Sequence, residues 1–548
     1  ISVQEVLSPA SDFTFTRGSN LSATRVNEAQ LIEKGRENIL LYSNDFSQSI
    51  WGKNSNSSIG SQTATDPFGV ANNAWLVTYD GTSNGRIEQQ ITQTGVKAMS
   101  LWVRTQSGTQ SIQVGFRGSS LSTYTATTTW QRFEHYDDHS TALYPRLRCD
   151  SATTLEMFGF QVEQGLVATG YIETEASTVQ AGLLENTPRL DYSGGATCPS
   201  LLLEPSRSNI FSQSEYYNTY WNLSNSSVAN NQSTSPEGLI NASVLSVVVS
   251  SQPGIQTFSS WSESNTYTMS AFVKKKIGSY IGFGVYGNAM GDNWIKWNLD
   301  NGTLTTNNLW TNANFEDYGN GWYRISATIT TTTGNTLKSG FKLNLMKNSS
   351  YSSGNVGDEA YIYGLQLEQA AYATSYIPTY GTSQTRAGES IADLDTSSLL
   401  TQSNNNTYFA EVVNHRNVGN TRFIASYDSA SSNADRILIY SGNSSNNYTL
   451  HCQHKVSGET TIQFNIATNV NYGETIKFAV VFNGTKMIGF ANGVKTATAT
   501  IVDADNFNKL DITDVNNELG VFKQLLAFPT ALSDLECEIL TGATTYET

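Results

Sequence analysis

Apolar and polar residues alternate along many short segments of the chain, which predicts β-strands with one buried face. In 111–118, Ile112, Val114 and Phe116 alternate with polar residues and glycine, and 280–287 repeats the pattern. Asp-Gly and Asn-Gly pairs between such segments indicate hairpin turns. No long stretch places apolar residues at helical spacing. The pattern therefore predicts an all-β chain built from antiparallel sandwiches.

One long segment occurs twice in tandem, in two copies that match at both ends and in the middle. The offset between matching residues grows from 171 at the start to 205 at the end, so the second copy is 34 residues longer. Insertions into surface loops cost little stability. The matching segments are LIEKGRENIL (31–40) with LLEPSRSNIF (202–211), AMSLWVR (98–104) with TMSAFVK (268–274), and FGFQVEQGLVATGYIET (158–174) with YGLQLEQAAYATSYIPT (363–379).

Comparison of the two copies separates scaffold positions from variable ones. Residues kept in both copies are expected to be architectural, and the kept glutamines are expected to satisfy buried backbone groups. The added residues fall mostly near 286–320, and we expect the binding site in the Trp-rich region 280–320 of the second copy. The kept residues are Trp130 and Trp322, Arg132 and Arg324, and Gln161 and Gln366.

The pattern changes from about residue 395, where a different sandwich is predicted. Residues 476–499 give two strands and then a hairpin, whose Asn492–Gly493 pair predicts a type I′ turn. Ser533 is placed to cap a short last helix. Prolines and paired glycines make the connector between the repeats a stiff, turn-rich spacer. The predicted organisation is a connector (1–37), a sandwich (38–180), a connector (181–208), a second sandwich (209–385) and a C-terminal sandwich (395–548).

Composition and charge exclude several classes of function. The formal net charge of −15 argues against nucleic acid, because phosphate binding needs a basic stripe. No apolar run approaches the ~20 residues that span a bilayer, so no membrane insertion is expected. The four cysteines form no CxxC pair, which argues against structural zinc and favours free buried thiols over a Cys452–Cys537 disulfide. Because residue 1 is Ile rather than Met, we expect a longer or processed product.

Aromatic residues in the second copy suggest a sugar platform, because a sugar ring lies on an aromatic face while amides and carboxylates reach its hydroxyls. In 294–300, alternation places Trp297 in the core and Trp294 on the outward face. Tyr280 and Tyr286 fall on the polar face of the neighbouring strand, and Trp310 lies in polar surroundings nearby. The predicted ligand-binding residues are therefore these four. The alternative is that they pack under long loops or at a subunit contact.

Catalytic constellations are not found. The acidic residues are dispersed, and the five histidines form no Ser–His–Asp arrangement. FEHYDDH (133–139) holds two histidines and two aspartates, but its first half aligns with an ordinary strand of the second copy, so a metal site is disfavoured. We expect a protein that is not an enzyme and binds no cofactor.

Three sets of motifs resemble known families. Each repeat has S-x-W/F-V-R/K and G-x-Q-x-E-Q segments after an Asn-Ile-Leu/Phe start, and resembles the jelly-roll carbohydrate-binding modules. The C-terminal motifs F-x-V-x-F-N-G, F-x-N-G and F-P-x-A-L-S-D-x-E resemble the concanavalin A-like/laminin G-like sandwich. The connector phrases ATRVNE-x-x-LIE and PRLDYSGG-x-x-CPSLLLEP look like phrases of tailed-bacteriophage virion proteins.

These resemblances imply a non-catalytic fibre or spike component of a phage virion, made in the bacterial host cytoplasm. It would bind host-surface or environmental polysaccharide and contact other virion proteins. A homotrimer is left open, because such fibres are often trimers, although no heptad repeat indicates one. Lectin-like virion sandwiches often hold a structural calcium ion, for which Asp300, Asp503 and Asp505 are the candidate ligands.

Two other functions remain open from the sequence. The chain is alternatively a structural capsid or tail decoration protein, whose sandwiches contact other virion subunits. A polysaccharide depolymerase is the third option and the least supported, because the Glu-x-Asp-x-x-Glu strand of the lectin-like glycosidases does not occur.

Overall fold

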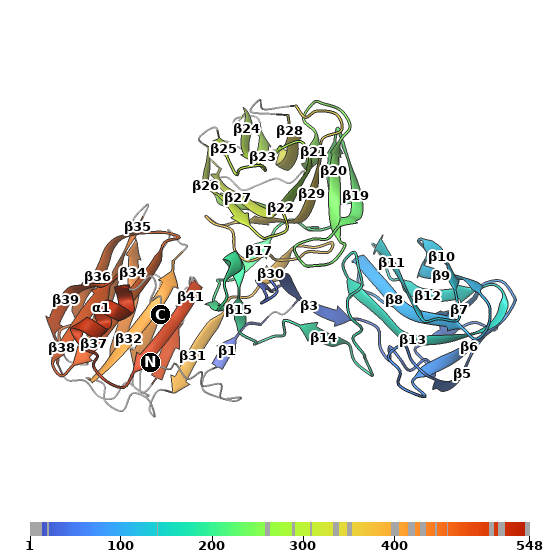
Figure 1. Cartoon of the computed structure of the whole chain (residues 1–548), viewed down its shortest axis with the longest axis horizontal. Coiled ribbons are helices and arrows are strands. Elements are labelled where there is room, and N and C mark those ends of the chain that lie inside the picture. The colour runs from blue at the N-terminus through green and yellow to red at the C-terminus, as the bar shows by residue number, and fades with distance from the viewer. Residues whose placement is uncertain are drawn as a thin grey trace.

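The fold is nearly all β, as the alternation predicts, with three antiparallel sandwiches arranged around a central hub of connector segments (Figure 1). One short helix, α1 (Asp534–Gly542), follows the last strand. No helix among the described residues is long and apolar enough to cross a bilayer. The computed structural model describes residues 14–18, 21–139, 141–257, 264–287, 291–306, 309–331, 339–347, 353–395, 405–414, 422–427, 435–443, 447–456, 459–502, 509–512 and 521–542.

Sandwich 1 packs two five-stranded sheets face to face, with the alternating residues predicted from sequence inside. Ile112, Val114 and Phe116 are each at most 1% exposed. One sheet, in spatial order, is β10 (Leu121–Ala126), β9 (Gln110–Arg117), β12 (Tyr144–Cys149), β7 (Gly85–Glu88) and β4 (Gly52–Lys53). The other is β11 (Gln131–His139), β8 (Gly95–Thr105), β13 (Ala152–Gln164), β6 (Ala74–Asp80) and β5 (Ser57–Ala64).

Sandwich 2 repeats this plan with two six-stranded sheets. One sheet is β18 (Asn222–Ser224), β21 (Gly254–Gln256), β28 (Ser339–Met346), β23 (Tyr280–Gly287), β24 (Gly291–Asn298) and β25 (Leu304–Thr306). The other is β19 (Ser226–Ser233), β20 (Ala242–Val247), β29 (Glu359–Glu368), β22 (Thr266–Ile277), β27 (Trp322–Thr330) and β26 (Trp310–Asp317). The additional edge strands β25 and β26 come from the longer segment of the second copy.

The duplicated residues make the same hydrogen bonds in both sandwiches, which confirms their architectural role. The Nε1 of Trp130 donates to the carbonyl of Thr65 at 3.1 Å, and that of Trp322 donates to Thr234 at 3.0 Å. The Oε1 of Gln161 accepts the backbone N–H of Ile172 at 2.6 Å. The Oε1 of Gln366 accepts that of Ile377, also at 2.6 Å. Buried backbone groups are thereby paired, as the sequence comparison predicts.

The C-terminal sandwich is completed by strands from far upstream in the chain. β1 (Thr14–Thr16) pairs with β31 (Ser390–Asp395), and β16 (Ser200–Leu202) pairs with β41 (Val521–Phe528). One sheet is β1, β31, β40 (Lys509–Ile512), β33 (Arg422–Tyr427), β34 (Arg436–Asn443), β35 (Asn447–Lys455) and β36 (Ile462–Asn471). The other is β15 (Arg189–Asp191), β16, β41, β32 (Asn405–Val413), β37 (Thr475–Asn483), β38 (Lys486–Ala491) and β39 (Val494–Thr500).

Local signals predicted for this last sandwich are confirmed. Asn492 and Gly493 both have positive φ, 46° and 82°, in the turn between β38 and β39. Ser533 precedes α1, and its backbone N–H donates to Oε2 of Glu536 at 2.8 Å, one half of a capping box. All four cysteines are free, including Cys452 and Cys537, so the disulfide alternative is not formed. Three are buried as predicted, whereas Cys198 is exposed.

The connectors form an ordered hub of paired strands, whereas the sequence predicted a stiff, turn-rich spacer between the repeats. The first contributes β2 (Thr24–Val26) and β3 (Ile32–Asn38), and β14 (Val179–Gly182) pairs with β3. The second contributes the β15–β16 hairpin and the single-turn η1 (Ser193–Gly195). β17 (Arg207–Asn209) pairs with β30 (Gln384–Arg386) across the ends of sandwich 2.

A buried network of ion pairs holds the hub together. Arg17, Arg189, Arg386 and Glu389 are at most 1% exposed, and Glu204 is largely covered. Glu389 accepts from Arg17 at 3.2 Å and from Nε of Arg189 at 2.5 Å. Glu204 accepts from Nη2 of Arg189 at 2.8 Å and from Nη1 of Arg386 at 3.0 Å. The network thus links the first connector, the second connector and the segment after sandwich 2.

We expect Glu389→Ala to lower the free energy of unfolding by about 3–5 kcal/mol, because it removes the buried carboxylate that pairs with Arg17 and leaves Arg189 with Glu204 as its remaining carboxylate. Glu33→Ala is the control, since its 2.8 Å pair with Arg25 is about a quarter exposed, and such pairs are worth about 1 kcal/mol or less. Chemical denaturation of the full chain measures both. Equal effects of the two variants would contradict a stabilising role for the buried network.

Acid is expected to open the hub before it unfolds the sandwiches. Burial alone would raise the pKa of Glu204, but the charges of Arg386 and Arg189 outweigh burial and hold this pKa well below its usual range. A lowered carboxylate pKa contributes stability in full above its ordinary value of about 4.3, and the contribution is lost as pH falls through the lowered value. Small-angle scattering below about pH 4 should show an expanded chain while circular dichroism still shows strands. Simultaneous loss of both signals would contradict this order.

Candidate functional site

The predicted platform in sandwich 2 is not formed as an exposed surface. Trp294 does lie on the face opposite Trp297, as alternation predicts, but only 1% of it is exposed. Its ring packs over Gly284 of the paired strand, where an added Cβ would lie 2.2 Å from the ring. The glycine thus leaves a space that the indole fills. The prediction that Trp294 faces solvent is wrong.

Trp310 is also buried, but it belongs to β26 of the facing sheet and lies in the core between the two sheets. It is 4% exposed within the core of sandwich 2, with its ring centroid 6.3 Å from that of Phe283. A β-bulge between Thr311 and Asn314 accompanies this placement at the start of β26. Trp294, on the outer face of one sheet, and Trp310, in the core between the sheets, therefore form no common platform.

The two tyrosines add little to that platform. Tyr280 is half-buried, and its hydroxyl accepts from Nδ2 of Asn298 at 3.4 Å. The side chain of Tyr286 lies outside the described residues, so its predicted role stays a prediction.

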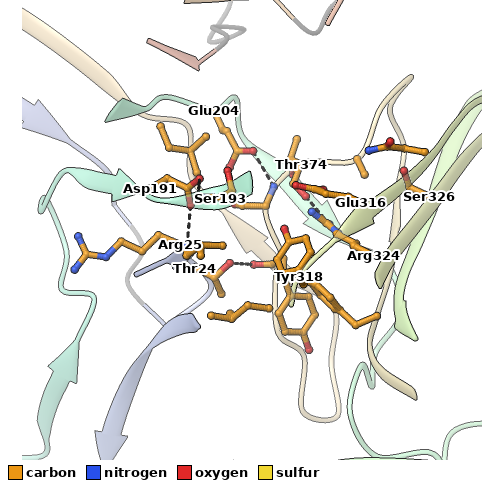
Figure 2. A pocket seen from close by; sticks show the side chains of 18 of the residues that line it. Thr24, Arg25, Asp191, Ser193, Glu204, Glu316, Tyr318, Arg324, Ser326 and Thr374 are labelled. Carbon is orange, nitrogen blue, oxygen red and sulfur yellow. Dashed lines mark hydrogen bonds between the residues drawn. The ribbon is translucent and has the colours of Figure 1, made fainter. Parts of the chain in front are cut away.

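A groove lies instead where sandwich 2 meets the hub (Figure 2). It encloses a cavity of about 350 Å³ and continues into a neighbouring one of about 390 Å³. Val26, Ser193, Glu316 and Tyr318 line both cavities, so the two form one continuous depression. Part of its wall comes from β26 and the following turn, in the region 280–320 that differs between the copies. The groove-lining residues there are different from the four that were predicted.

Sandwich 2 supplies a wall of cationic, acidic and aromatic side chains. Nη2 of Arg324, on β27, donates to Oγ of Ser270 at 3.1 Å and to the carbonyl of Thr374 at 2.6 Å. Glu316 and Tyr318 lie beside it (Figure 2). Burial raises the pKa of Glu316, and the charge of Arg324 only partly offsets this. Burial likewise raises the pKa of the Tyr318 phenol, so this hydroxyl stays protonated.

The connectors supply the opposite wall, whose carboxylates are held by backbone groups. Asp191 accepts the backbone N–H of Val26 at 2.7 Å and that of Ser193 at 3.2 Å. Glu204 accepts the backbone N–H of Ser375 at 2.8 Å, in addition to its arginines. Thr24 Oγ1 donates to the carbonyl of Tyr376 at 2.6 Å. This wall is therefore rigid, because its polar groups are fixed before any ligand arrives.

The groove has the chemistry that a sugar requires. Tyr318, Tyr372, Asn312, Asn314 and Glu316 line it, which combines aromatic rings for the C–H side of a pyranose with amide and carboxylate groups for its hydroxyls. Sequence reasoning missed the connector wall, because it treated the connectors as spacers. The signal was present as Thr-Arg pairs at 16–17, 24–25 and 385–386, whose arginines all form ion pairs in and around the hub.

No cluster of three or more metal-ligating side chains occurs among the described residues. Of the calcium candidates, Asp300 is exposed and forms an ion pair with Lys275. Asp503 and Asp505 lie outside the described residues. In the 133–139 strand, both ring nitrogens of His135 engage serine hydroxyls, at 3.1 and 3.0 Å.

Comparisons with known proteins give a likeness of fold alone. No family model matches the chain, and no curated protein matches it. A heptameric SAP-like pentraxin from Limulus polyphemus is 16% identical over 25% of this chain and 70% of its own, with a TM-score of 0.22. The CBM40 of the Ruminococcus gnavus IT-sialidase, bound to α2,3-sialyllactose, is 15% identical over 25% and 83%, with a TM-score of 0.21. The CBM22-1–CBM22-2 tandem of Paenibacillus barcinonensis Xyn10C is 10% identical over 65% and 100%, with a TM-score of 0.22. TM-scores this low carry no argument about function.

Trp294→Ala is expected to destabilise the chain by about 3–5 kcal/mol, because it empties a buried space above Gly284. Thermal unfolding measures this loss. Replacement of the exposed Val249 by Ala in the same sandwich is the control and should change stability by less than about 0.5 kcal/mol. If Trp294→Ala unfolds like the control, then the indole is not a packing residue.

Proposed function

We propose that the chain is a non-catalytic, glycan-binding component of a phage virion, a fibre or spike that binds host-surface or environmental polysaccharide. The observation that carries the proposal is the groove between sandwich 2 and the hub, in which tyrosines, amides and Glu316 line one continuous depression. The connector phrases support the virion assignment. Two or more weak sites on one particle would gain strength from multivalency.

The absence of a catalytic step in this proposal rests on how the carboxylates are engaged. Glycoside hydrolysis generally needs two carboxyl groups that flank one bond, one as acid and one as base or nucleophile. Asp191 is bound to two backbone N–H groups, and Glu204 to two arginines and Ser375. These two carboxylates serve the structure, and Asp317 of the neighbouring cavity accepts the backbone N–H of Gly319 at 2.7 Å, so we assign Glu316 as the groove acid that contacts the ligand.

A second candidate function is a structural capsid or tail decoration protein. The observation that favours it is the hub itself, because buried ion pairs and shared strands join the connectors to the end of sandwich 2 and to the C-terminal sandwich. A joined body of this kind presents the surfaces of both sandwiches to neighbouring subunits. Under this function the groove would hold a segment of another virion protein.

Binding to immobilised host capsular and cell-wall polysaccharide tests the groove. Asn314→Ala and Glu316→Gln each remove one polar contact at the groove wall, and we expect each to weaken retention about tenfold, the equivalent of about 1.4 kcal/mol. Neither residue is in a core cluster, so thermal unfolding should stay unchanged.

Tyr220→Ala is the control, since this tyrosine is 38% exposed and lies outside the groove. If both groove variants are retained as strongly as the wild-type protein, then the groove is not the binding site. Wild-type protein that is not retained on any glycan, but is essential for particle assembly, would favour the decoration function. Release of reducing ends from the polysaccharide would refute the non-catalytic proposal.

A further inference from the structure

An aromatic cluster lies on the outer face of one sheet of sandwich 1, away from the groove. Phe68, Trp102, Phe158 and Tyr171 stand in edge-to-face contact, with ring centroids 5.3–5.9 Å apart. Phe68 is 66% exposed, and Trp102 is partly exposed. An exposed aromatic ring that stands beside partly exposed rings offers a ligand a flat apolar surface.

The position of Phe68 is fixed by a rigid turn. Oδ1 of Asp66 accepts the backbone N–H of Phe68 at 2.8 Å and that of Val70 at 2.9 Å. Its Oδ2 accepts from Nδ2 of Asn73 at 2.8 Å. Because the turn is fixed, the ring is presented at little cost in conformational entropy when a ligand binds.

The same face of sandwich 2 is covered by the first connector. Ile32 of β3 packs against Phe272, Trp322 and Tyr376. Its backbone N–H donates to the carbonyl of Pro236 at 2.9 Å. The cluster of sandwich 1 is thus the counterpart of a face that is an interface in sandwich 2.

Buried ion pairs hold the first connector on the covered face of sandwich 2. Lys34 of the connector forms ion pairs with Glu215 at 2.5 Å and Glu237 at 2.8 Å, and its Nζ lies 5.1 Å from the ring centre of Tyr363. Arg36 also pairs with Glu237. The face of sandwich 2 therefore receives a cationic strand through two buried carboxylates.

Sandwich 1 lacks these carboxylates at the equivalent positions. Matching turn hydrogen bonds place Phe68 where sandwich 2 has Glu237, since the Asp66–Val70 bond corresponds to the Ser235–Leu239 bond. The same correspondence places Asn44 at the position of Glu215 and Phe158 at that of Tyr363. A connector of the Lys34 type would bury its cation on this face without a partner, which is costly. This face of sandwich 1 therefore carries Phe68 and Asn44 where the face of sandwich 2 carries two carboxylates.

We propose that this face of sandwich 1, the Phe68–Trp102 platform, binds a neutral glycan as a second sugar site of the chain. The proposal rests on the glycan-binding function proposed above. The apolar C–H face of a pyranose stacks on the exposed ring of Phe68, and Trp102, whose ring centre lies 4.7 Å from the guanidinium carbon of Arg132, borders the sugar at its edge. Polar groups along the rim reach the hydroxyls of the sugar. At that rim, Nε of Arg104 pairs with Glu156 at 2.5 Å and Arg104 lies over the Trp130 ring, so the rim carries balanced charge. Balanced charge and a net −15 for the chain favour a neutral over an anionic glycan.

Affinity electrophoresis of the full chain in gels that contain laminarin, xylan, galactomannan or dextran tests the platform. Phe68→Ala should reduce retardation in the binding gel about tenfold without a change in thermal unfolding. Val70→Ala is the matched control, because it lies in the same turn, is 54% exposed and takes no part in the ring contacts. Trp102→Phe tests the second ring with a smaller aromatic that keeps the packing.

The outcomes separate the platform from the function it rests on. If Asn314→Ala weakens the retardation and Phe68→Ala leaves it unchanged, then the platform is overturned, while the proposed glycan-binding function is retained. Wild-type protein that no gel retards, neutral or host-derived, overturns both. If Phe68→Ala alters only the molar mass measured by light scattering, then the face is a contact between copies of the chain and the platform is overturned. Phe68→Glu introduces the residue that sandwich 2 has at the corresponding position, Glu237, and it should abolish retardation if the platform binds the glycan.

Discussion

The structure depends on a buried ion network in which two carboxylates satisfy three arginines. Glu389 and Glu204 bridge Arg17, Arg189 and Arg386, which come from three connector segments separated by some two hundred residues each. A buried charge is tolerated only when it is paired and hydrogen-bonded, so each segment needs the others before it can leave water. This requirement converts flexible linkers into an ordered hub. The hub in turn fixes the position of sandwich 2 relative to the connector wall, and hence the groove.

Duplication gave the chain two copies of one sandwich, and their outer faces then diverged. In sandwich 2 that face carries Glu215 and Glu237 and is closed by Lys34 of the first connector. In sandwich 1 the same face carries Phe68 and stays open. One scaffold therefore serves as an intramolecular interface in one copy and as an exposed aromatic surface in the other. The hydrogen bonds of the kept Trp and Gln residues are the same in both copies although the outer faces differ.

Much of the fold was predictable because it rests on local patterns. Alternation placed Ile112, Val114 and Phe116 inside sandwich 1, and the Asn492–Gly493 pair specified the turn between β38 and β39 of the C-terminal sandwich. The repeat identified the architectural Trp and Gln positions. The binding residues were not predictable in the same way. Alternation states which face of a strand a side chain occupies, but it does not state what covers that face, and Trp294 is on the predicted face yet buried.

The sequence by itself determined the all-β class, the tandem repeat and the change of domain near residue 395. These features depend on the period of apolar residues, on turn residues and on similarity between segments of the chain, all of which can be read from the sequence alone. Only the tertiary structure decided that the connectors are woven into the C-terminal sandwich and that they close sandwich 2 but not sandwich 1. Those outcomes depend on charges that meet across long sequence separations, such as Arg17 with Glu389, and no local pattern records such a meeting.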